Sequence, residues 1–243
     1  MSRTLQEDDR PINPCKKFLR WASGDKCWRY WDKESESMEL VPHKTPFIVL
    51  DQLSTCSGFN DRKNCGVWSN EVRNLKLPMR VQDKDGEVFS GPWREVKEKV
   101  HYAKFCASVY AVAKLGDDYE IVNFQLSGAA LSGWIDFLKE LGGSKAVYGD
   151  VVVSVPSVGE GKKGSVNYSF PEFKVVSNTL SDDAKAKADE ADSTLQAYLT
   201  AYFAATPEGK AAKVHSEEME SYQPPAPSPE PTLPAEEDDE MPF

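Results

Sequence analysis

The sequence predicts a mainly β protein with one or two helices, built as a small closed or half-closed barrel and followed by a C-terminal helix and a disordered acidic tail. Three observations support this. Short runs rich in Val, Ile, Tyr, Phe and Trp recur between turn-forming residues over most of the chain. One stretch with the apolar spacing of a helix interrupts them. The last part is rich in proline and acids, a composition that cannot bury a core.

The charge is unevenly distributed along the 243 residues. The formal charge of −10 divides into a net −8 over residues 204–243, −3 over residues 178–203 and +1 over residues 1–177. A chain of this length can bury one good-sized core with appended segments. The nearly neutral body can therefore present a basic surface to an anionic partner, although the protein as a whole is acidic.

Membrane, metal and cofactor signals are absent from the sequence. No apolar run approaches the roughly 18 residues of a membrane span, and the N-terminal residues lack the apolar stretch of a signal peptide. We expect a cytoplasmic protein, without membrane attachment, whose five cysteines are free thiols. The cysteines lack the paired spacing of zinc ligands, so we expect no metal and no cofactor.

The elements follow in order. Residues 1–14 are polar and end in Pro-Ile-Asn-Pro, which predicts an N-terminal arm. Residues 15–177 form the predicted body. Its expected strands are residues 26–31, 45–53, 66–72, 106–115, 119–128, 146–155 and 165–176. Turn residues at 115–119 and 159–164 predict hairpins.

Two helices are expected. Ser127 or Ser132 can cap GWIDFLKELGG, in which apolar residues share one face and two glycines end the helix. The second helix lies in residues 178–205, after an acidic N-terminal signal at residues 181–183. Its stripe is Leu195, Tyr198, Leu199, Tyr202 and Phe203. This stripe predicts docking on the body or on a second subunit, so a homo-oligomer stays open.

Residues 206–243 form the predicted tail. Most acidic tails only add solubility. This tail differs from such tails at its end, where the acids are followed by apolar residues. The last six residues are Asp238, Asp239, Glu240, Met241, Pro242 and Phe243. A terminal Phe presents a ring beside a carboxylate, which suits a small apolar pocket next to a Lys or Arg, and the acids steer it toward a basic surface. The tip therefore predicts a partner-binding peptide.

These six residues closely resemble the C-terminal tip of bacterial single-stranded-DNA-binding proteins, DDDIPF, with Glu240 and Met241 as the two differences. The wider layout resembles the single-strand binders of bacteriophage replication, in which an OB-fold body carries a C-terminal helix and an acidic tail with a terminal Phe. The resemblance implies an OB-fold-like five-stranded barrel with extensions, in the cytoplasm of a bacterial host. It also implies that the tip recruits replication, recombination and repair proteins (a polymerase, primase-helicase, nuclease or recombinase), and that the tail competes with DNA for the body's groove.

Binding a single strand without sequence preference requires rings that stack on bases and cations that follow the phosphates. Residues 15–33 interleave the two most densely. On a strand, Trp28 and Tyr30 share one face and Arg29 and Trp31 the other, and one of these pairs is expected to be core. The candidate stacking residues are Trp28, Tyr30, Trp31, Phe59 and Trp68. The candidate phosphate contacts are Lys16, Lys17, Arg29, Arg62, Lys63, Lys162 and Lys163.

Enzyme signatures are missing: the sequence has no P-loop, no GxGxxG after a strand, no GxSxG and no HExxH. We therefore predict a non-enzymatic single-stranded-DNA-binding protein with no catalytic residues. Two alternatives stay open. One is a protein–protein adaptor with a docking tail and no DNA affinity, and the other is a DNA-processing nuclease, which predicts carboxylates converging in one cleft.

Overall fold

The computed structural model describes residues 12–148 and 151–205. Residues 1–11, most of the predicted arm, and residues 206–243, the predicted tail, lie outside the described residues. The described chain forms eleven strands, three α-helices and one 3-10 turn, and all the strands belong to a single sheet. The prediction of a mainly β protein is confirmed.

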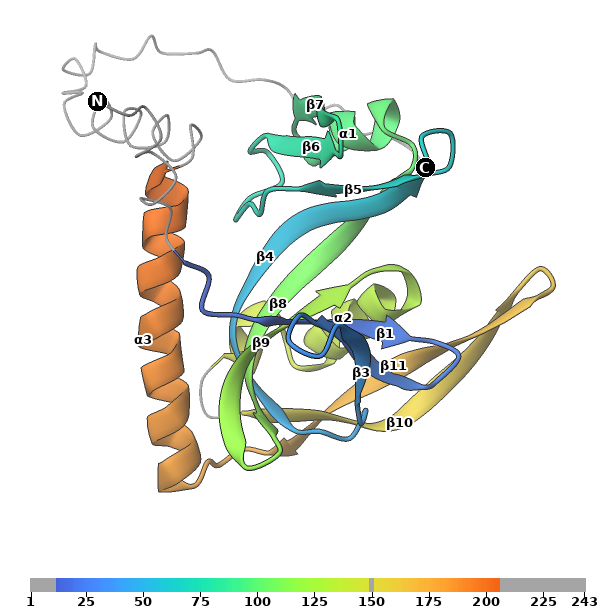
Figure 1. Ribbon diagram of the computed structural model, residues 1–243. Coiled ribbons are helices and arrows are strands. Elements are labelled where there is room, and N and C mark those ends of the chain that lie inside the picture. Colours follow the sequence, from blue (N-terminus) through green and yellow to red (C-terminus); the bar gives the residue numbers. More distant parts are fainter. Residues whose placement is uncertain (1–11, 149–150, 206–243) are drawn as a thin grey trace, which may run out of the picture.

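Two long antiparallel strands organise this sheet (Figure 1). They are β4 (Phe47–Asn60) and β8 (Ala103–Leu115), which pair over nearly their whole length. The strand order is β3-β2-β1-β9-β8-β4-β5-β6-β7 in a sheet of eleven strands. The sheet is open, so of the two predicted forms, a closed or a half-closed five-stranded barrel, the closed barrel is wrong. The reason is the length of β4 and β8, whose two ends diverge and carry different sets of strands instead of meeting around one core.

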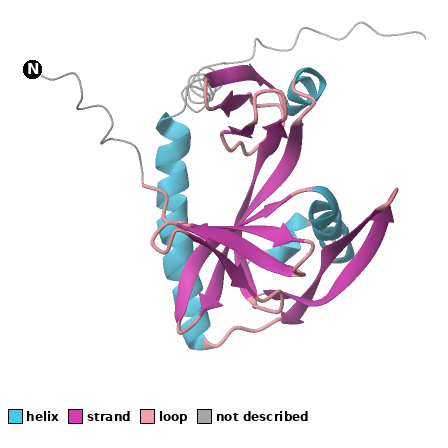
Figure 2. Cartoon of the chain, turned by 45° about the vertical axis from the view of Figure 1, so that its right-hand side comes forward, coloured by secondary structure: helices cyan, strands magenta, loops and turns pink. Residues whose placement is uncertain are grey.

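The first set gathers at the start of β4. It contains β1 (Lys17–Ala22), β2 (Cys27–Asp32), β3 (Ser37–Val41), β9 (Asp118–Leu126), β10 (Val152–Lys163) and β11 (Val166–Ser177). Helix α2 (Gly128–Glu140) and the 3-10 turn Ser144–Val147 pack with them. Figure 2 shows β10 and β11 as a hairpin that projects from this part of the molecule.

Aromatic side chains fill the core of this set. The ring of Trp28 lies 4.8 Å from that of Phe124, and Trp134 lies 5.0 Å from Phe173, centroid to centroid. Trp28 is 0% exposed, so the prediction that it stacks on a base is wrong. The alternation of β2 places its even-numbered residues inward, and Trp28 is with Trp134 one of the two largest side chains of that core.

The second set gathers at the other end of β4 and β8. It contains β5 (Cys65–Ser69), β6 (Met79–Asp83), β7 (Gly86–Gly91) and the short helix α1 (Trp93–Lys99). A separate cluster around Met79, Val81 and Val96 forms its core. Gly58 lets two chain segments approach here, because a Cβ at this position would lie 2.0 Å from the carbonyl oxygen of Tyr102.

Helix α3 (Asp182–Ala205) covers the face of β4, β8 and β9 that α2 leaves free. Leu195 and Leu199 are buried against Leu53 and Tyr110, as the predicted apolar stripe requires. Beside them the carboxylate of the half-buried residue Glu71 accepts hydrogen bonds from the hydroxyls of Ser108 and Tyr110. Burial raises the pKa of Glu71 above its ordinary value.

No helix among the described residues is long and apolar enough to cross a membrane.

The local signals in the sequence agree with these elements unevenly. Both predicted helices are confirmed, and α2 begins after Ser127, one of its two candidate caps. Strands β1, β3, β6 and β7 were not predicted. The predicted turn at residues 159–164 is misplaced, because β10 continues to Lys163 and the chain reverses at Gly164, whose φ is +63°.

Candidate nucleic-acid interface

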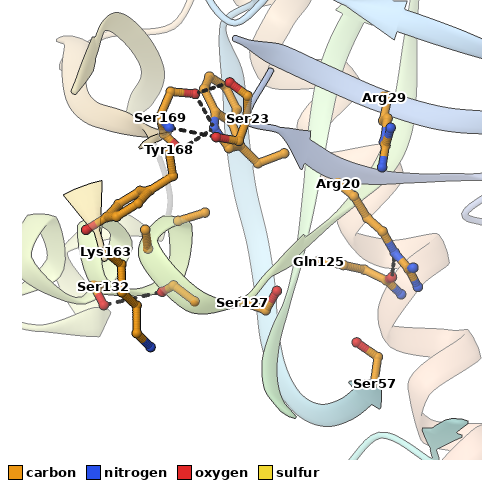
Figure 3. Close-up of a pocket in the computed structure, with 14 residues that line it drawn as sticks. Arg20, Ser23, Arg29, Ser57, Gln125, Ser127, Ser132, Lys163, Tyr168 and Ser169 are labelled. Atoms are coloured by element: carbon orange, nitrogen blue, oxygen red, sulfur yellow. Dashed lines mark hydrogen bonds between the residues drawn. The ribbon is translucent and has the colours of Figure 1, made fainter. Parts of the chain in front are cut away.

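A groove crosses the molecule between β1 and β2, the β10–β11 hairpin and the second strand set. Its centre lies between β1 and β2 on one side and the hairpin on the other, with the start of α2 at its floor (Figure 3). One end reaches β5 and β8 through Arg20, Ser57 and Ser127, which line both hollows. The other end reaches the outer part of the hairpin through Ser23, Tyr168 and Ser169.

The groove is strongly basic. Its lining includes six basic side chains, Arg20, Lys26, Arg29, Lys104, Lys162 and Lys163, and a single acid, Glu160. Glu160 lies 2.5 Å from Nζ of Lys26, and this contact lowers the pKa of the Glu160 carboxyl. Among the described residues, no carboxylate lies within ion-pair distance of Arg29, Lys104, Lys162 or Lys163. Positive charge therefore outweighs negative charge along this concave surface.

Pairing between β1 and β2 directs the two arginines to the same side. Arg20 and Arg29 are directly opposite each other in the antiparallel register, so their side chains leave the same face of the sheet. Nε of Arg20 donates a 2.8 Å hydrogen bond to Oε1 of Gln125 on the neighbouring β9, which orients the guanidinium without neutralising it.

The hairpin is held against the turn between β1 and β2. The amide of Ser169 donates to Oγ of Ser23 at 2.6 Å, and Oγ of Ser169 donates to the Ser23 carbonyl at 2.6 Å. Nε1 of Trp21 donates to the Ser169 carbonyl at 2.9 Å. These bonds join segments more than 140 residues apart in the chain and fix the distance between the two walls of the groove.

Tyr168 contributes an aromatic surface to the hairpin wall, and two glycines make room for such rings. Gly161 is paired with Tyr168 and Gly159 with Phe170. A Cβ would lie 2.5 Å from the Tyr168 ring in the first pair and 2.4 Å from the Phe170 ring in the second. The sequence analysis did not select Tyr168. The pattern that could have identified it is a Gly-Glu-Gly segment on one strand of the hairpin, opposite a Tyr-Ser-Phe segment on the other.

Trp68 and Lys104 form the opposite end of the groove. Both side chains lie on the face of the sheet that carries Ser57, because Ser57 pairs with Lys104 on β8 and with Trp68 on β5. Trp68 is 49% exposed although its ring is apolar. Phe59 is similarly exposed on the same face of β4, two residues beyond Ser57, but it does not line the groove.

The start of α2 adds backbone donors. Ser127, Gly128, Ala129 and Ala130 line the groove, and the first turn of the helix contains no acid. The unpaired N–H groups and the positive end of the helix dipole therefore add to the positive potential of the six basic side chains.

Four predicted residues meet in the groove: Arg29, Trp68, Lys162 and Lys163. Others are placed elsewhere. Lys17 forms a 2.6 Å ion pair with Glu120 and lies over the half-buried ring of Tyr30, on the face opposite Arg29. Lys63 forms ion pairs with Asp83 at 2.8 Å and Asp85 at 3.1 Å, which raise its pKa. These two lysines are already neutralised by carboxylates, so they are poor candidates for phosphate contacts.

The remaining predicted residues lie outside the groove. Lys16 and Arg62 are exposed but do not line it. Trp31 is exposed on the outward face of β2. The predicted partner-binding tip, residues 238–243, falls outside the described residues. Arg20, Lys26, Lys104 and Tyr168 are groove residues that the sequence prediction did not select.

Comparison with protein families, curated proteins and solved structures finds no match. In residues 12–148 and 151–205, no three His, Cys, Asp or Glu side chains are grouped so that they could hold a metal ion.

Proposed function

We propose that this chain binds single-stranded DNA in the groove without chemical turnover, coating and protecting exposed strands during replication, recombination or repair, as single-strand binders of bacteriophages do. The observation that carries the proposal is the groove lining, in which six basic side chains and one acid surround the exposed Trp68 ring and the Tyr168 ring.

The rings favour a single strand over a duplex. Bases that are paired and stacked in a duplex offer no free face to Trp68 or Tyr168, whereas unpaired bases stack on such rings with about 1–3 kcal/mol each. The basic side chains follow the phosphates of either form. We therefore expect the affinity for both forms to fall as salt is added, because the electrostatic attraction is screened. The affinity for single strands should nevertheless remain higher than that for the duplex.

The tail supplies the second part of the proposed function. Its last six residues resemble a peptide that recruits replication proteins, and the groove suits a DNA strand, so the two activities are assigned to different parts of the chain. Replacing Phe243 with Ala should abolish capture of partner proteins while oligonucleotide affinity stays within about twofold, because the ring is the apolar anchor of the tip. Pull-down from a bacterial lysate beside an oligonucleotide titration measures both; loss of both activities would assign the tip a structural role.

The test of DNA binding is fluorescence anisotropy with the full chain and labelled oligothymidylate, the same length of RNA, and a duplex, at two salt concentrations. We expect the single-stranded DNA to bind more tightly than the duplex at both. No binding of any oligonucleotide at low salt would leave the adaptor alternative, and metal-dependent shortening of the DNA would favour the nuclease.

A further inference from the structure

We propose that the outward face of β1, β2 and β3 is a second contact surface for the same nucleic acid, on which bases stack after the strand leaves the groove. We call this surface the platform and define it by four apolar side chains, Phe18, Trp31, Met38 and Leu40. The inference rests on the proposed function and extends it, because it assigns the strand a path in two segments with different contacts.

The four platform side chains share one face. Trp31 is paired with Met38, and Arg29 with Leu40, in the register of β2 and β3. Phe18 lies two residues before Arg20 on β1 and therefore points to the same side. The platform residues are 37%, 53%, 54% and 58% exposed, in chain order, whereas the alternating residues Leu19, Trp28 and Val41 are buried in the core. Four large apolar side chains on adjacent strands form a continuous exposed apolar surface, a feature that marks binding sites.

The charges around the platform favour a polyanion as its occupant. Arg20 and Arg29 lie on this face, and both also line the groove. The acids of the same strands, Asp32 and Glu39, lie on the opposite face by the alternation of β2 and β3. The platform is thus apolar with arginines and no carboxylate from these strands, which is the combination that stacked bases and their phosphates require.

The two arginines connect the platform to the groove. A strand that follows the basic lining from Lys163 past Arg29 arrives at the row Arg20–Arg29–Leu40, and the next row along β2 is Trp31–Met38. β3 is the last strand at this end of the sheet, so none of the described strands covers its outer edge. In the groove the phosphates face basic side chains on both walls; on the platform the bases face the protein.

A site in two segments predicts affinity that rises in two steps with strand length. The test is anisotropy titration of the full chain with oligothymidylates from about 4 to about 24 nucleotides, which spans the site sizes of about 4–16 nucleotides found for one binding module. The variant Trp31→Ala/Leu40→Ala should lose about tenfold in affinity for the long strands and nothing for the shortest strands that bind, since stacking surfaces for one or two bases are gone. The matched control is Ile135→Ala/Val176→Ala, which removes two other exposed apolar side chains. This control should change neither the affinity for long strands nor the affinity for short strands.

Each other outcome has a defined meaning. If the wild-type chain binds no oligonucleotide, the proposed function itself fails. If the wild type binds and the Trp31/Leu40 variant loses affinity equally at all lengths, or at none, the platform is overturned while the groove stands. A further outcome is that the Trp31/Leu40 variant, without DNA, sediments with a lower mass than the wild type while its affinity depends on strand length as in the wild type. That result would assign this face to contact between copies of the chain and would also overturn the inference.

Discussion

Most basic side chains of the groove have no carboxylate partner among the described residues, whereas several basic side chains elsewhere on the body form ion pairs. Lys17, Lys63 and Arg73 each lie within 3.2 Å of a carboxylate oxygen. In the groove, Lys26 alone has a carboxylate partner among the described residues, Glu160. Clustered like charges without counter-charges destabilise a fold by self-repulsion, and a bound anion removes that cost. Lys16 and Arg62 are exposed outside the groove and also have no carboxylate partner among the described residues. The candidate DNA surface is therefore marked by the clustering of such cations along one hollow beside aromatic rings, and not by the lack of a partner alone.

The tryptophans divide in the same way. Trp28 and Trp134 are almost completely buried, whereas Trp31 and Trp68 are about half exposed. Burial of an aromatic ring stabilises the core, but an exposed ring gains nothing from the fold and is available to a ligand. The buried and exposed residues can therefore be separated by whether their replacement changes stability or binding.

The largest expected effect tests the tryptophans. Trp28→Ala should lower the free energy of unfolding by about 3–5 kcal/mol, because it leaves a cavity among aromatic side chains. Trp68→Ala should change stability by less than about 0.5 kcal/mol, as is usual for exposed positions, and weaken oligonucleotide binding by about 1–3 kcal/mol. Urea unfolding and anisotropy measure the two quantities. A large stability loss with Trp68→Ala would show that this ring is part of the fold and not of the site.

The next effect tests the basic side chains directly. The triple variant Arg29→Gln/Lys162→Gln/Lys163→Gln should weaken binding at low salt by at least about tenfold and reduce the salt slope by about 0.7 for each phosphate that is no longer neutralised. The control Lys17→Gln/Lys63→Gln/Arg73→Gln removes the same net charge from paired positions. It should leave the salt slope nearly unchanged. Equal slopes for the two variants would mean that net charge alone attracts the DNA.

A smaller effect is expected from the hairpin. Gly161→Ala should weaken oligonucleotide binding by about twofold to tenfold, because the new methyl displaces the Tyr168 ring that lines the groove. Gly24→Ala is the control, since Gly24 also lines the groove but nothing lies within 4 Å of a Cβ at that position. Both affinities come from the same anisotropy titration. If the two variants bind alike, the placement of the Tyr168 ring does not matter for binding.

The smallest effect concerns the face covered by α3. Because the pKa of Glu71 is raised in the fold, the native state holds its proton longer than the unfolded state, whose carboxyl titrates near 4.5. Its contribution to stability is therefore present at acidic pH and is lost as the pH rises above about 4.5. Glu71→Gln should gain stability relative to wild type across that rise, measured by urea unfolding at several pH values. A constant difference would mean that Glu71 titrates alike in both states.

The parts predicted from sequence are those that local periodicity controls. Helices α2 and α3 follow from apolar spacing within one segment, and the apolar and aromatic runs of β8 and β9 are equally local. Strands β3 and β6, SMELV and MRVQD, are short and half polar, so their pairing depends on neighbours that local patterns do not reveal. The sheet stays open because β4 continues past its apolar start through the more polar segment STCSGFN. Local patterns in the sequence do not reveal how far this strand extends.

The site was predictable to the same degree. Arg29 and Trp68 could be selected because they interrupt apolar strands with exposed basic or aromatic side chains. Lys104 could not, because it reaches the groove only through the pairing of β8 with Ser57 on the distant strand β4. Tyr168 was missed although its partner Gly161 lies in the same hairpin, because the alternation of glycines and aromatic residues was not used. Trp28 and Trp31 are separated by three positions and equal in chemistry, and only the direction of the β2 pleat decides which one is core.

The glycines under the hairpin rings constrain how this part of the chain can evolve. Positions 161 and 168 form one pair and positions 159 and 170 another, and in each pair a ring occupies the space of the missing Cβ. A side chain gained at 161 or 159 must displace the ring at 168 or 170, unless a smaller residue replaces that ring. Among descendants of this sequence, the two members of each pair should therefore change together.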